Sequence, residues 1–271
     1  MNPDWIQDLC GIILDMDGVL WKEDQPLGDL PAAFGMIRKQ GWQIMGMTNN
    51  STRTPDHYLD RLRKFGVELQ PGQVINSSEA TAHYLYDCFP EGGAVFMIGE
   101  EGLRTALEQK GFKSYQTEVP ETEPVAVVAG MDRELTYLKI ETAARYIRGG
   151  SLFIGTNPDK TYPTPEGLSP GAGVVLAAVE AASGQAPLVM GKPHKRMYQT
   201  VLERMGCEPA RVLVVGDRLE TDILGAQEIG CKSALVLSGI SSREDVREWS
   251  PQPDMIAENI NRLFVELLDY E

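Results

Sequence analysis

Two aspartates stand two residues apart near the start of the chain, directly after a short apolar segment. Asp15 and Asp17 follow the sequence Gly-Ile-Ile-Leu at residues 11–14, and such a run bounded by glycine is typical of a buried strand. Side chains at positions i and i+2 of extended backbone point to one face, so both carboxylates can enter one site. Two acids with different surroundings can divide a reaction between a nucleophile and a proton donor.

The same Asp-x-Asp-Gly run also begins calcium-binding loops, which require glycine at loop position six and glutamate at position twelve. Counted from Asp15, the glycine is Gly18 at position four, and Pro26 stands at position twelve. The calcium template therefore does not fit. Taken alone, this segment is also explained by a strand followed by an ordinary polar turn, and that alternative stays open.

Polar residues follow three further apolar segments. Taken singly, each group is explained by helix caps, turns or a solvated lysine. Ligands of open α/β sheets bind at the carboxyl ends of the strands, so four such groups together could form one site. They would supply an acid pair, a hydroxyl with amide donors, a cation and a further acid, the groups that phosphoryl transfer requires. The three groups are Thr48-Asn49-Asn50-Ser51-Thr52, Gly191-Lys192-Pro193 and Gly216-Asp217-Arg218-Leu219-Glu220-Thr221-Asp222.

Apolar strand-like runs alternate with helical patterns along the chain, which predicts an α/β fold with parallel sheets of βαβ units. A break at residues 90–93 separates two such series, and a loop rich in proline and glycine is predicted at residues 157–173. Strands are predicted at residues 11–14, 42–47, 73–75, 94–98, 125–129, 152–154, 188–190, 211–215 and 234–237. Helices are predicted at residues 30–40, 54–65, 77–88, 102–110, 135–148, 174–182, 195–205 and 221–229.

The composition is that of a globular protein. The 271 residues exceed the usual size of one domain and indicate two, and a hydrophobic content of 42% is enough for a real core. The formal net charge of −14 argues against nucleic acid or an anionic membrane as the main partner. An anionic substrate would therefore need local positive charge or a metal ion to hold it.

The cysteines are scattered and contain no Cys-x-x-Cys pair, so we expect reduced thiols rather than a disulfide framework or a zinc site. They are Cys10, Cys88, Cys207 and Cys231. Residues 1–8 contain no apolar stretch of signal-peptide length, and no run approaches the length of a membrane span. The expected location is the cytoplasm.

The four motifs resemble those of the haloacid dehalogenase (HAD) superfamily phosphatases, in subfamily IIA, which contains NagD, 4-nitrophenylphosphatase and pyridoxal phosphate phosphatase. The resemblance covers essentially the whole chain. It implies a Rossmann-like parallel-sheet core at residues 1–90 and 188–271, with an inserted α/β cap domain of the C2 type at residues 91–187. Thr156-Asn157-Pro158-Asp159 and Pro170-Gly171-Ala172-Gly173 are similar to the cap signature of this branch.

The resemblance also implies roles for the catalytic residues. Asp15 would be the nucleophile that forms an aspartyl-phosphate. Asp17 would protonate the leaving oxygen and then activate the water that cleaves the intermediate. Thr48 would bind phosphoryl oxygens, and Lys192 would offset the crowded negative charge.

The metal implied by the resemblance is Mg²⁺, which prefers oxygen ligands and shares them with substrate phosphate and water. The Asp15 side chain, the Asp17 backbone carbonyl and Asp217 would hold it, with Asp222 supporting them. Backbone donors near Asn49 and Asn50 would complete the phosphate site. The expected partner is a small phosphorylated metabolite, and a homodimer formed through the cap is a further expectation.

One position departs from the pyridoxal phosphate phosphatases, which carry a histidine in the cap loop where this chain has Tyr162. Tyr162 is a candidate contact for the leaving group, although a tyrosine packed on the cap is an equal alternative. His194 follows the lysine motif and is placed near the entrance to the site. For His57 and His83, in helical patterns, a packing or surface role is favoured.

The predicted function is Mg²⁺-dependent hydrolysis of small phosphorylated metabolites, with 4-nitrophenyl phosphate as a further substrate. Phosphoryl transfer to a sugar, as in a phosphotransferase or phosphomutase, stays open. A non-catalytic phosphate-binding regulatory domain is the second alternative, but a receiver domain would lack both the second acid at i+2 and the large insertion. The substrate itself cannot be read from the motifs because cap loops select it.

Overall fold

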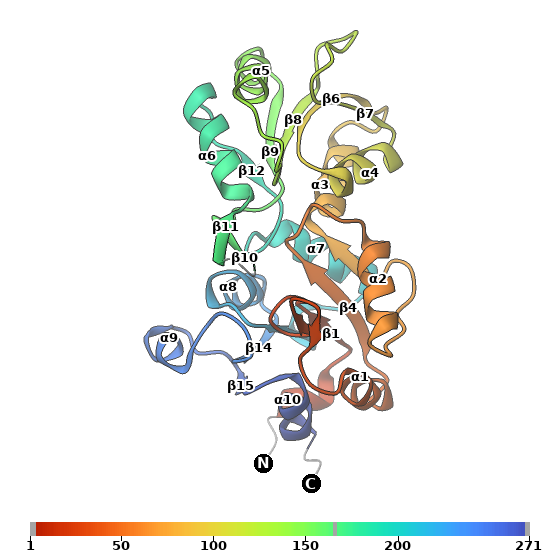
Figure 1. Ribbon diagram of the computed structural model, residues 1–271. Coiled ribbons are helices and arrows are strands. Elements are labelled where there is room, and N and C mark those ends of the chain that lie inside the picture. Colours follow the sequence, from red (N-terminus) through yellow and green to blue (C-terminus); the bar gives the residue numbers. More distant parts are fainter. Residues whose placement is uncertain (1–3, 165–166, 269–271) are drawn as a thin grey trace. The chain divides into compact units, whose positions relative to one another are not determined.

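The computed structural model describes residues 4–164 and 167–268, which form two compact units (Figure 1). Unit 1 comprises Met1–Thr48, Pro55–Ile75 and Lys192–Glu271. Unit 2 comprises Asn49–Thr54 and Asn76–Gly191. The predicted domain ranges include residues 1–3, 165–166 and 269–271, which lie outside the described residues.

Unit 1 is built on a six-stranded sheet in the order β15-β14-β13-β1-β4-β5. β1 lies at its centre, parallel to β13 on one side and to β4 on the other, with Leu14 opposite both Val215 and Gly46. All four residues of β1 are buried, which is why its sequence is continuously apolar rather than alternating. The strands are β1 (Gly11–Leu14), β4 (Gln43–Thr48), β5 (Val74–Asn76), β13 (Val212–Gly216), β14 (Lys232–Val236) and β15 (Met255–Ala257).

The helices of unit 1 pack their apolar faces against the sheet. α1 (Leu30–Lys39), α2 (Pro55–Lys64) and α10 (Ile260–Leu267) share one hydrophobic cluster with β1 and β13. α7 (Lys195–Met205) packs against α8 (Leu224–Ile229) and β4. The shorter elements are η1 (Asp4–Asp8), the antiparallel pair β2 (Trp21–Lys22) and β3 (Gln25–Pro26), η2 (Pro209–Arg211), η3 (Leu219–Ile223) and α9 (Arg243–Glu248).

Unit 2 contains a five-stranded parallel sheet in the order β12-β9-β8-β6-β7, with helices on both faces. Side chains of β6 alternate between these faces: Val95 and Met97 pack in the cluster of α3 and α4, and Phe96 and Ile98 in that of α5 and α6. The elements are α3 (Ser77–Cys88), β6 (Gly93–Ile98), α4 (Glu101–Gln109), β7 (Phe112–Tyr115), β8 (Ala126–Ala129), α5 (Tyr137–Arg148), β9 (Leu152–Gly155), β10 (Thr161–Thr164), β11 (Gly167–Pro170), α6 (Ala172–Ser183) and β12 (Leu188–Val189).

The units divide at other points than the predicted domain boundary at residue 90. α3 belongs to unit 2 because Ala82 and Leu85 pack in one hydrophobic cluster with Val95 and Met97. The assignment of core and cap domains stays a prediction. The segment predicted as a loop at residues 157–173 contains β10 and β11, which pair antiparallel, and α6 begins at Ala172.

The cysteine prediction is wrong for two residues, because Cys10 and Cys207 form a disulfide with their Cα atoms 6.4 Å apart. Cys10 precedes β1 and Cys207 follows α7, so the fold joins residues that are 197 positions apart in the sequence. Cys88 and Cys231 are free. Among the described helices, none has both the length and the apolar character needed to cross a membrane.

Candidate active site

The carboxyl ends of three neighbouring strands carry the first residues of the site. β1 leads into Asp15, β13 leads into Asp217, and β4 ends at Thr48. The Asp15 N–H donates to the Val215 carbonyl at 2.9 Å, which continues the β1–β13 ladder and fixes the backbone of Asp15. Because these strands are parallel, their ends meet at one edge of the sheet, where ligands of α/β folds bind.

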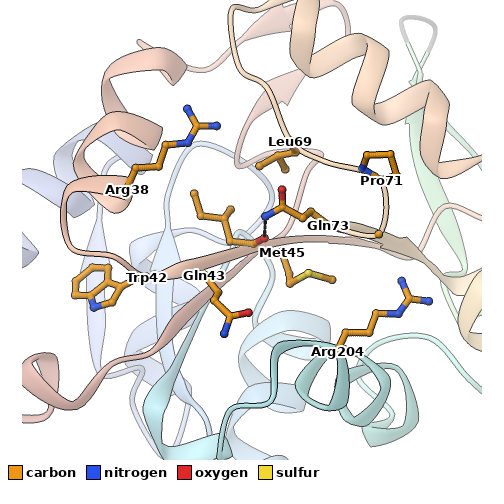
Figure 2. A pocket seen from close by; sticks show the side chains of 10 residues that line it. Arg38, Trp42, Gln43, Met45, Leu69, Pro71, Gln73 and Arg204 are labelled. Carbon is orange, nitrogen blue, oxygen red and sulfur yellow. Dashed lines mark hydrogen bonds between the residues drawn. The ribbon is translucent and has the colours of Figure 1, made fainter.

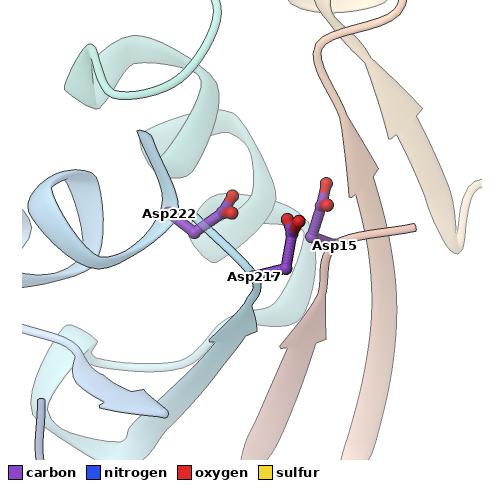
Figure 3. Close-up of side chains that lie close together, drawn as sticks. All are labelled: Asp15, Asp217 and Asp222. Atoms are coloured by element: carbon purple, nitrogen blue, oxygen red, sulfur yellow. The ribbon is translucent and has the colours of Figure 1, made fainter. Parts of the chain in front are cut away.

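Three buried carboxylates gather at this edge (Figure 3). Asp15, Asp217 and Asp222 each offer an oxygen atom, and these oxygens lie within 4.8 Å of one another. Asp222 comes from η3, a single turn of π-helix that follows β13. Like charges this close are unstable unless protons or cations compensate for them.

Lys192 supplies one compensating charge. Its Nζ donates to Oδ1 of Asp15 and, at 2.6 Å, to Oδ1 of Asp222. Burial alone would favour the neutral amine, but the two carboxylates outweigh it and hold the pKa of Lys192 well above its ordinary value. Lys192 is therefore an ammonium ion that links Asp15 to Asp222.

Asp217 is held by the loop that follows β14. The Ile240 N–H donates to its Oδ2 at 2.8 Å, and the Ser241 N–H donates to its backbone carbonyl at 3.0 Å. A Cβ atom on Gly239 would lie 1.9 Å from that Oδ2, and one on Gly18 would lie 2.3 Å from it, so only glycine fits at both positions. Burial first, and then the charge of Asp222, raise the pKa of Asp217 to about 7.

Asp222 is fixed from several sides. The Arg218 N–H donates to its Oδ2 at 3.2 Å, and the buried Tyr198 hydroxyl donates to its backbone carbonyl at 3.1 Å. A Cβ atom on Gly216 would lie 2.1 Å from the Asp222 Cβ, so β13 must end in glycine. These contacts hold Asp222 in the position where its Oδ1 accepts a hydrogen bond from the Lys192 ammonium.

Asp17 differs from the buried acids because it keeps an exposed surface. The Nε1–H of Trp21 donates to its Oδ1 at 2.8 Å. Dense protein around the carboxyl group raises the pKa of Asp17, and the Trp21 hydrogen bond opposes that rise. Contact with water limits the rise, since water stabilises the ionised form. A carboxyl group with a raised pKa is suited to donate a proton.

The residues after Thr48 have partners within unit 2. The Asn49 side-chain amide donates to Asp159 at 3.1 Å, and the Asn49 carbonyl accepts from Asn157 Nδ2 at 2.8 Å. Asn50 Oδ1 accepts from the backbone N–H and the hydroxyl of Thr52 at 3.0 and 2.8 Å. Asn50 therefore forms a local turn of the kind that asparagine side chains often stabilise. The predicted phosphate-binding role of Asn49 and Asn50 stays a prediction.

Tyr162 lies in β10 of unit 2, half-buried and opposite Ser169 of β11. Its contact with a leaving group stays a prediction. His194 and His57 are exposed and His83 is half-buried, so the surface or packing role favoured for His57 and His83 agrees with the structure.

Three groups of supporting residues were not singled out from the sequence: Trp21, Tyr198 and the loop at residues 238–241. Trp21 could have been noticed because it directly follows the first motif, four residues after Asp17. The loop follows a predicted strand at the same edge of the sheet as the other motifs. Tyr198 sits in an ordinary helical pattern, and nothing in the sequence distinguishes it.

A separate cavity of about 460 Å³ lies in unit 1 beside the first residues of β4 (Figure 2). Arg38, Trp42 and Arg204 contribute to its lining, and Gln73 Nε2 donates to the Ile44 carbonyl at 3.0 Å. Thr48 ends β4 at the opposite end of the strand, so this cavity does not belong to the acid cluster.

The acid cluster has the donor set of a hard divalent cation. The cluster contains three carboxylates, and one ammonium pairs with two of them, so the fully ionised group has an excess of negative charge. Mg²⁺ takes oxygen ligands of this kind and leaves room for water and phosphate. The residues present therefore fit Mg²⁺. The roles of Asp15, Asp217 and the Asp17 carbonyl as its ligands stay predictions.

Comparison with known proteins places this arrangement in a family. Residues 12–113 match the haloacid dehalogenase-like hydrolase family, and residues 189–263 match a HAD-hydrolase-like family. The chain is 35% identical over 248 residues to dihydroxyacetone phosphatase of Corynebacterium glutamicum, covering 92% of this chain and 88% of that protein.

Solved structures agree with this placement. A 4-nitrophenylphosphatase from Thermotoga maritima superposes with a TM-score of 0.89 at 30% identity, covering 98% of this chain and all of that one. A glycerol phosphate phosphatase from Mycobacterium tuberculosis, solved in complex with magnesium, gives a TM-score of 0.87 at 30% identity, covering 97% of this chain and 78% of that one.

A parallel α/β sheet with an aspartate cluster and a lysine at its carboxyl edge defines a hydrolase of the haloacid dehalogenase class. The chain belongs to this family, in its NagD-like branch, and it is a phosphoric monoester hydrolase. The predicted family and the predicted α/β fold class are thereby confirmed.

Proposed function

We propose that this enzyme is a Mg²⁺-dependent phosphatase that hydrolyses small phosphorylated metabolites through an aspartyl-phosphate on Asp15. The observation that carries the proposal is the buried group of Asp15, Lys192, Asp222 and Asp217 at the carboxyl edge of the sheet. It combines an ionisable nucleophile, a fixed cation and oxygen ligands for a metal, which are the parts that phosphoryl transfer needs.

The proposed reaction has two halves that share one proton carrier. In the first, an Asp15 oxygen bonds to phosphorus, the bond to the leaving oxygen breaks, and that oxygen takes the proton of Asp17. In the second, a water oxygen bonds to phosphorus, its proton passes to Asp17, and the bond to Asp15 breaks. The sum is one ester and one water converted to one alcohol and one phosphate, with Asp15 and Asp17 regenerated.

The other residues would stabilise the negative charge of Asp15 and of the phosphoryl group. Lys192 keeps Asp15 ionised for attack and then offsets the charge of the phosphoryl group. Thr48 would donate its hydroxyl to a phosphoryl oxygen from the end of β4. When bound by Asp15 and Asp217, Mg²⁺ would supply positive charge that stabilises the phosphoryl oxygens as charge redistributes.

The names of two relatives suggest where to look for a substrate. Dihydroxyacetone phosphate and glycerol phosphate, which these relatives are named for, are both three-carbon phosphate esters. We propose that esters of this size are the first class to test, with Tyr162 contacting the leaving group. Cytoplasmic location and a homodimer through the cap domain stay predictions of the sequence.

The direct test measures inorganic phosphate release from 4-nitrophenyl phosphate and from a panel of three- to six-carbon phosphate esters, with Mg²⁺ and with EDTA. We expect release only with the metal, and we expect Asp15→Asn to abolish it without unfolding the protein. Including free sugars as acceptors tests transfer: the appearance of a new phosphate ester instead of inorganic phosphate would favour a phosphotransferase. No turnover of any ester by the folded, metal-loaded protein would reject the proposal.

A further inference from the structure

The tryptophan that follows the first motif is completely buried and touches the proposed proton carrier. Trp21 has none of its surface exposed, and its Nε1–H donates to Oδ1 of Asp17 at 2.8 Å. Burying an indole ring stabilises a fold wherever the ring lies. Packing alone, however, does not explain why the polar edge of this ring faces the carboxylate.

The backbone between the two residues is a compact loop that fixes their distance. The Gly18 N–H donates to the Trp21 carbonyl at 2.8 Å, and the Leu20 N–H donates to the Met16 carbonyl at 2.8 Å. Gly18 has a φ of +86°, a left-handed conformation that glycine adopts without strain. The loop therefore returns the chain so that the indole meets Asp17.

Side chains from α2 and the residue after it restrict the ring. The Arg61 guanidinium lies 4.5 Å from the centroid of the Trp21 ring, and the Tyr58 ring is stacked parallel to it at 6.5 Å. The Phe65 ring packs against it at 6.1 Å in a tilted arrangement. A cation and two aromatic rings around one indole leave it little freedom to rotate.

An indole N–H is a donor only, whereas a protonated carboxyl group donates from its hydroxyl oxygen and accepts best at its carbonyl oxygen. Oδ1 of Asp17 must therefore accept from Trp21 in either protonation state. We propose that Trp21 is a positioning residue that reserves Oδ1 of Asp17 as an acceptor and thereby assigns proton transfer to Oδ2. This inference rests on the proposed function, in which Asp17 protonates the leaving oxygen.

The proposed consequence depends on the leaving group. Without the indole donor, the carboxyl group of Asp17 can rotate, because its terminal torsion is broad, and either oxygen can carry the proton. Esters of weakly acidic alcohols need that proton as the bond to phosphorus breaks. Esters of 4-nitrophenol do not, because the 4-nitrophenolate ion leaves readily by itself.

The experiment compares kcat/KM for 4-nitrophenyl phosphate, phenyl phosphate and glycerol phosphate in wild type and Trp21→Phe. Phenylalanine keeps an aromatic ring and removes the donor. We expect a loss of about tenfold to a hundredfold on glycerol phosphate, the worth of a hydrogen bond to an ionisable group, and of less than about threefold on 4-nitrophenyl phosphate. Trp42→Phe is the matched control, since Trp42 lies beside the separate cavity, and it should leave all three values unchanged.

A second pair of variants separates positioning from packing. Replacing Trp21 by β-(3-benzothienyl)alanine exchanges the N–H for sulfur with little change of shape, so it should reproduce the selective loss even if Trp21→Phe fails to fold. In an Asp17→Asn background, the same replacement should add no further dependence on the leaving group. Equal losses on all three esters, or no loss, would overturn the inference. Wild-type protein inactive on the whole series would instead refute the proposed function, and the inference with it.

Discussion

Removal of the Lys192 ammonium is the perturbation whose consequences follow most directly from the site. In Lys192→Met, the carboxylates of Asp15 and Asp222 lose the cation that lies between them, while the side chain keeps a similar length. The Lys192 side chain is 4% exposed and that of Asp222 is 2%, with 2.6 Å between Nζ and Oδ1. Solvent therefore cannot replace the lost partner.

Breaking a buried ion pair by removing one partner costs about 3–5 kcal/mol of stability. We expect a value near the lower end, about 3 kcal/mol, because burial already raises the pKa of Asp15, so that carboxylate can take up a proton. Turnover should fall about a hundredfold or more, the loss typical of removing one fixed electrostatic contact from a reacting centre. Urea unfolding gives the first value and phosphate release gives the second.

The double variant Lys192→Met/Asp222→Asn tests the reasoning itself. It removes one of the two buried carboxylates that lose their cation. It should therefore be more stable, by about 1–3 kcal/mol, than the sum of the two single changes predicts. It should stay inactive. The exposed Lys195, three residues further on, provides the control Lys195→Met, with an expected change below about 0.5 kcal/mol. Additive effects of the two substitutions would refute the shared buried pair.

Three further predictions concern the metal, pH and substrate choice. EDTA should abolish activity and Mg²⁺ restore it, and Asp217→Asn should raise the Mg²⁺ requirement by more than about tenfold while removing the Mg²⁺-induced rise in Tm; full activity after chelation would contradict this. Without metal, the pKa of Asp217 is about 7 in the folded protein against 3.8 unfolded, so the folded state binds more protons between these values. Tm without metal should therefore fall as pH rises from about 4 to about 7, and Mg²⁺ should raise it most near pH 7. A metal-free Tm that rises over this range would contradict the prediction. Finally, Tyr162→Ala should change relative kcat/KM among phosphate esters more than it changes the rate on acetyl phosphate, and equal changes would mean that Tyr162 does not contact the leaving group.

The sequence predicted the parts of the fold that rest on continuous patterns. Strands such as β1 and β6 and helices such as α3 and α7 were placed within a residue or so, because buried strands and amphipathic helices show their period locally. The sequence analysis did not predict β2, β3, β7, β15, α9 and α10. The sequence predicts a loop where β10 and β11 pair antiparallel. The reason is that Pro163 and Pro170 argue against a strand.

The residues of the candidate site could be predicted because they follow strands in a fixed order: acids after β1 and β13, Thr48 at the end of β4, and Lys192 shortly after β12. What holds them could not, since it depends on close approach between distant segments. Gly239 fits against Asp217, and Tyr198 reaches the backbone of Asp222 from a different helix. The Cys10–Cys207 disulfide was missed for the same reason: no local pattern reports that two positions 197 residues apart are neighbours.

The central claim, that Asp15 carries the phosphoryl group, is tested most directly by trapping that intermediate. Reactions with Mg²⁺ and 4-nitrophenyl phosphate would be quenched in acid during turnover, and the protein mapped by peptide mass spectrometry. We predict one phosphoryl group on the peptide containing Asp15, sensitive to base as an acyl phosphate is, and none in Asp15→Asn. A phosphoryl group on another residue, or continued phosphate release by Asp15→Asn, would contradict the account.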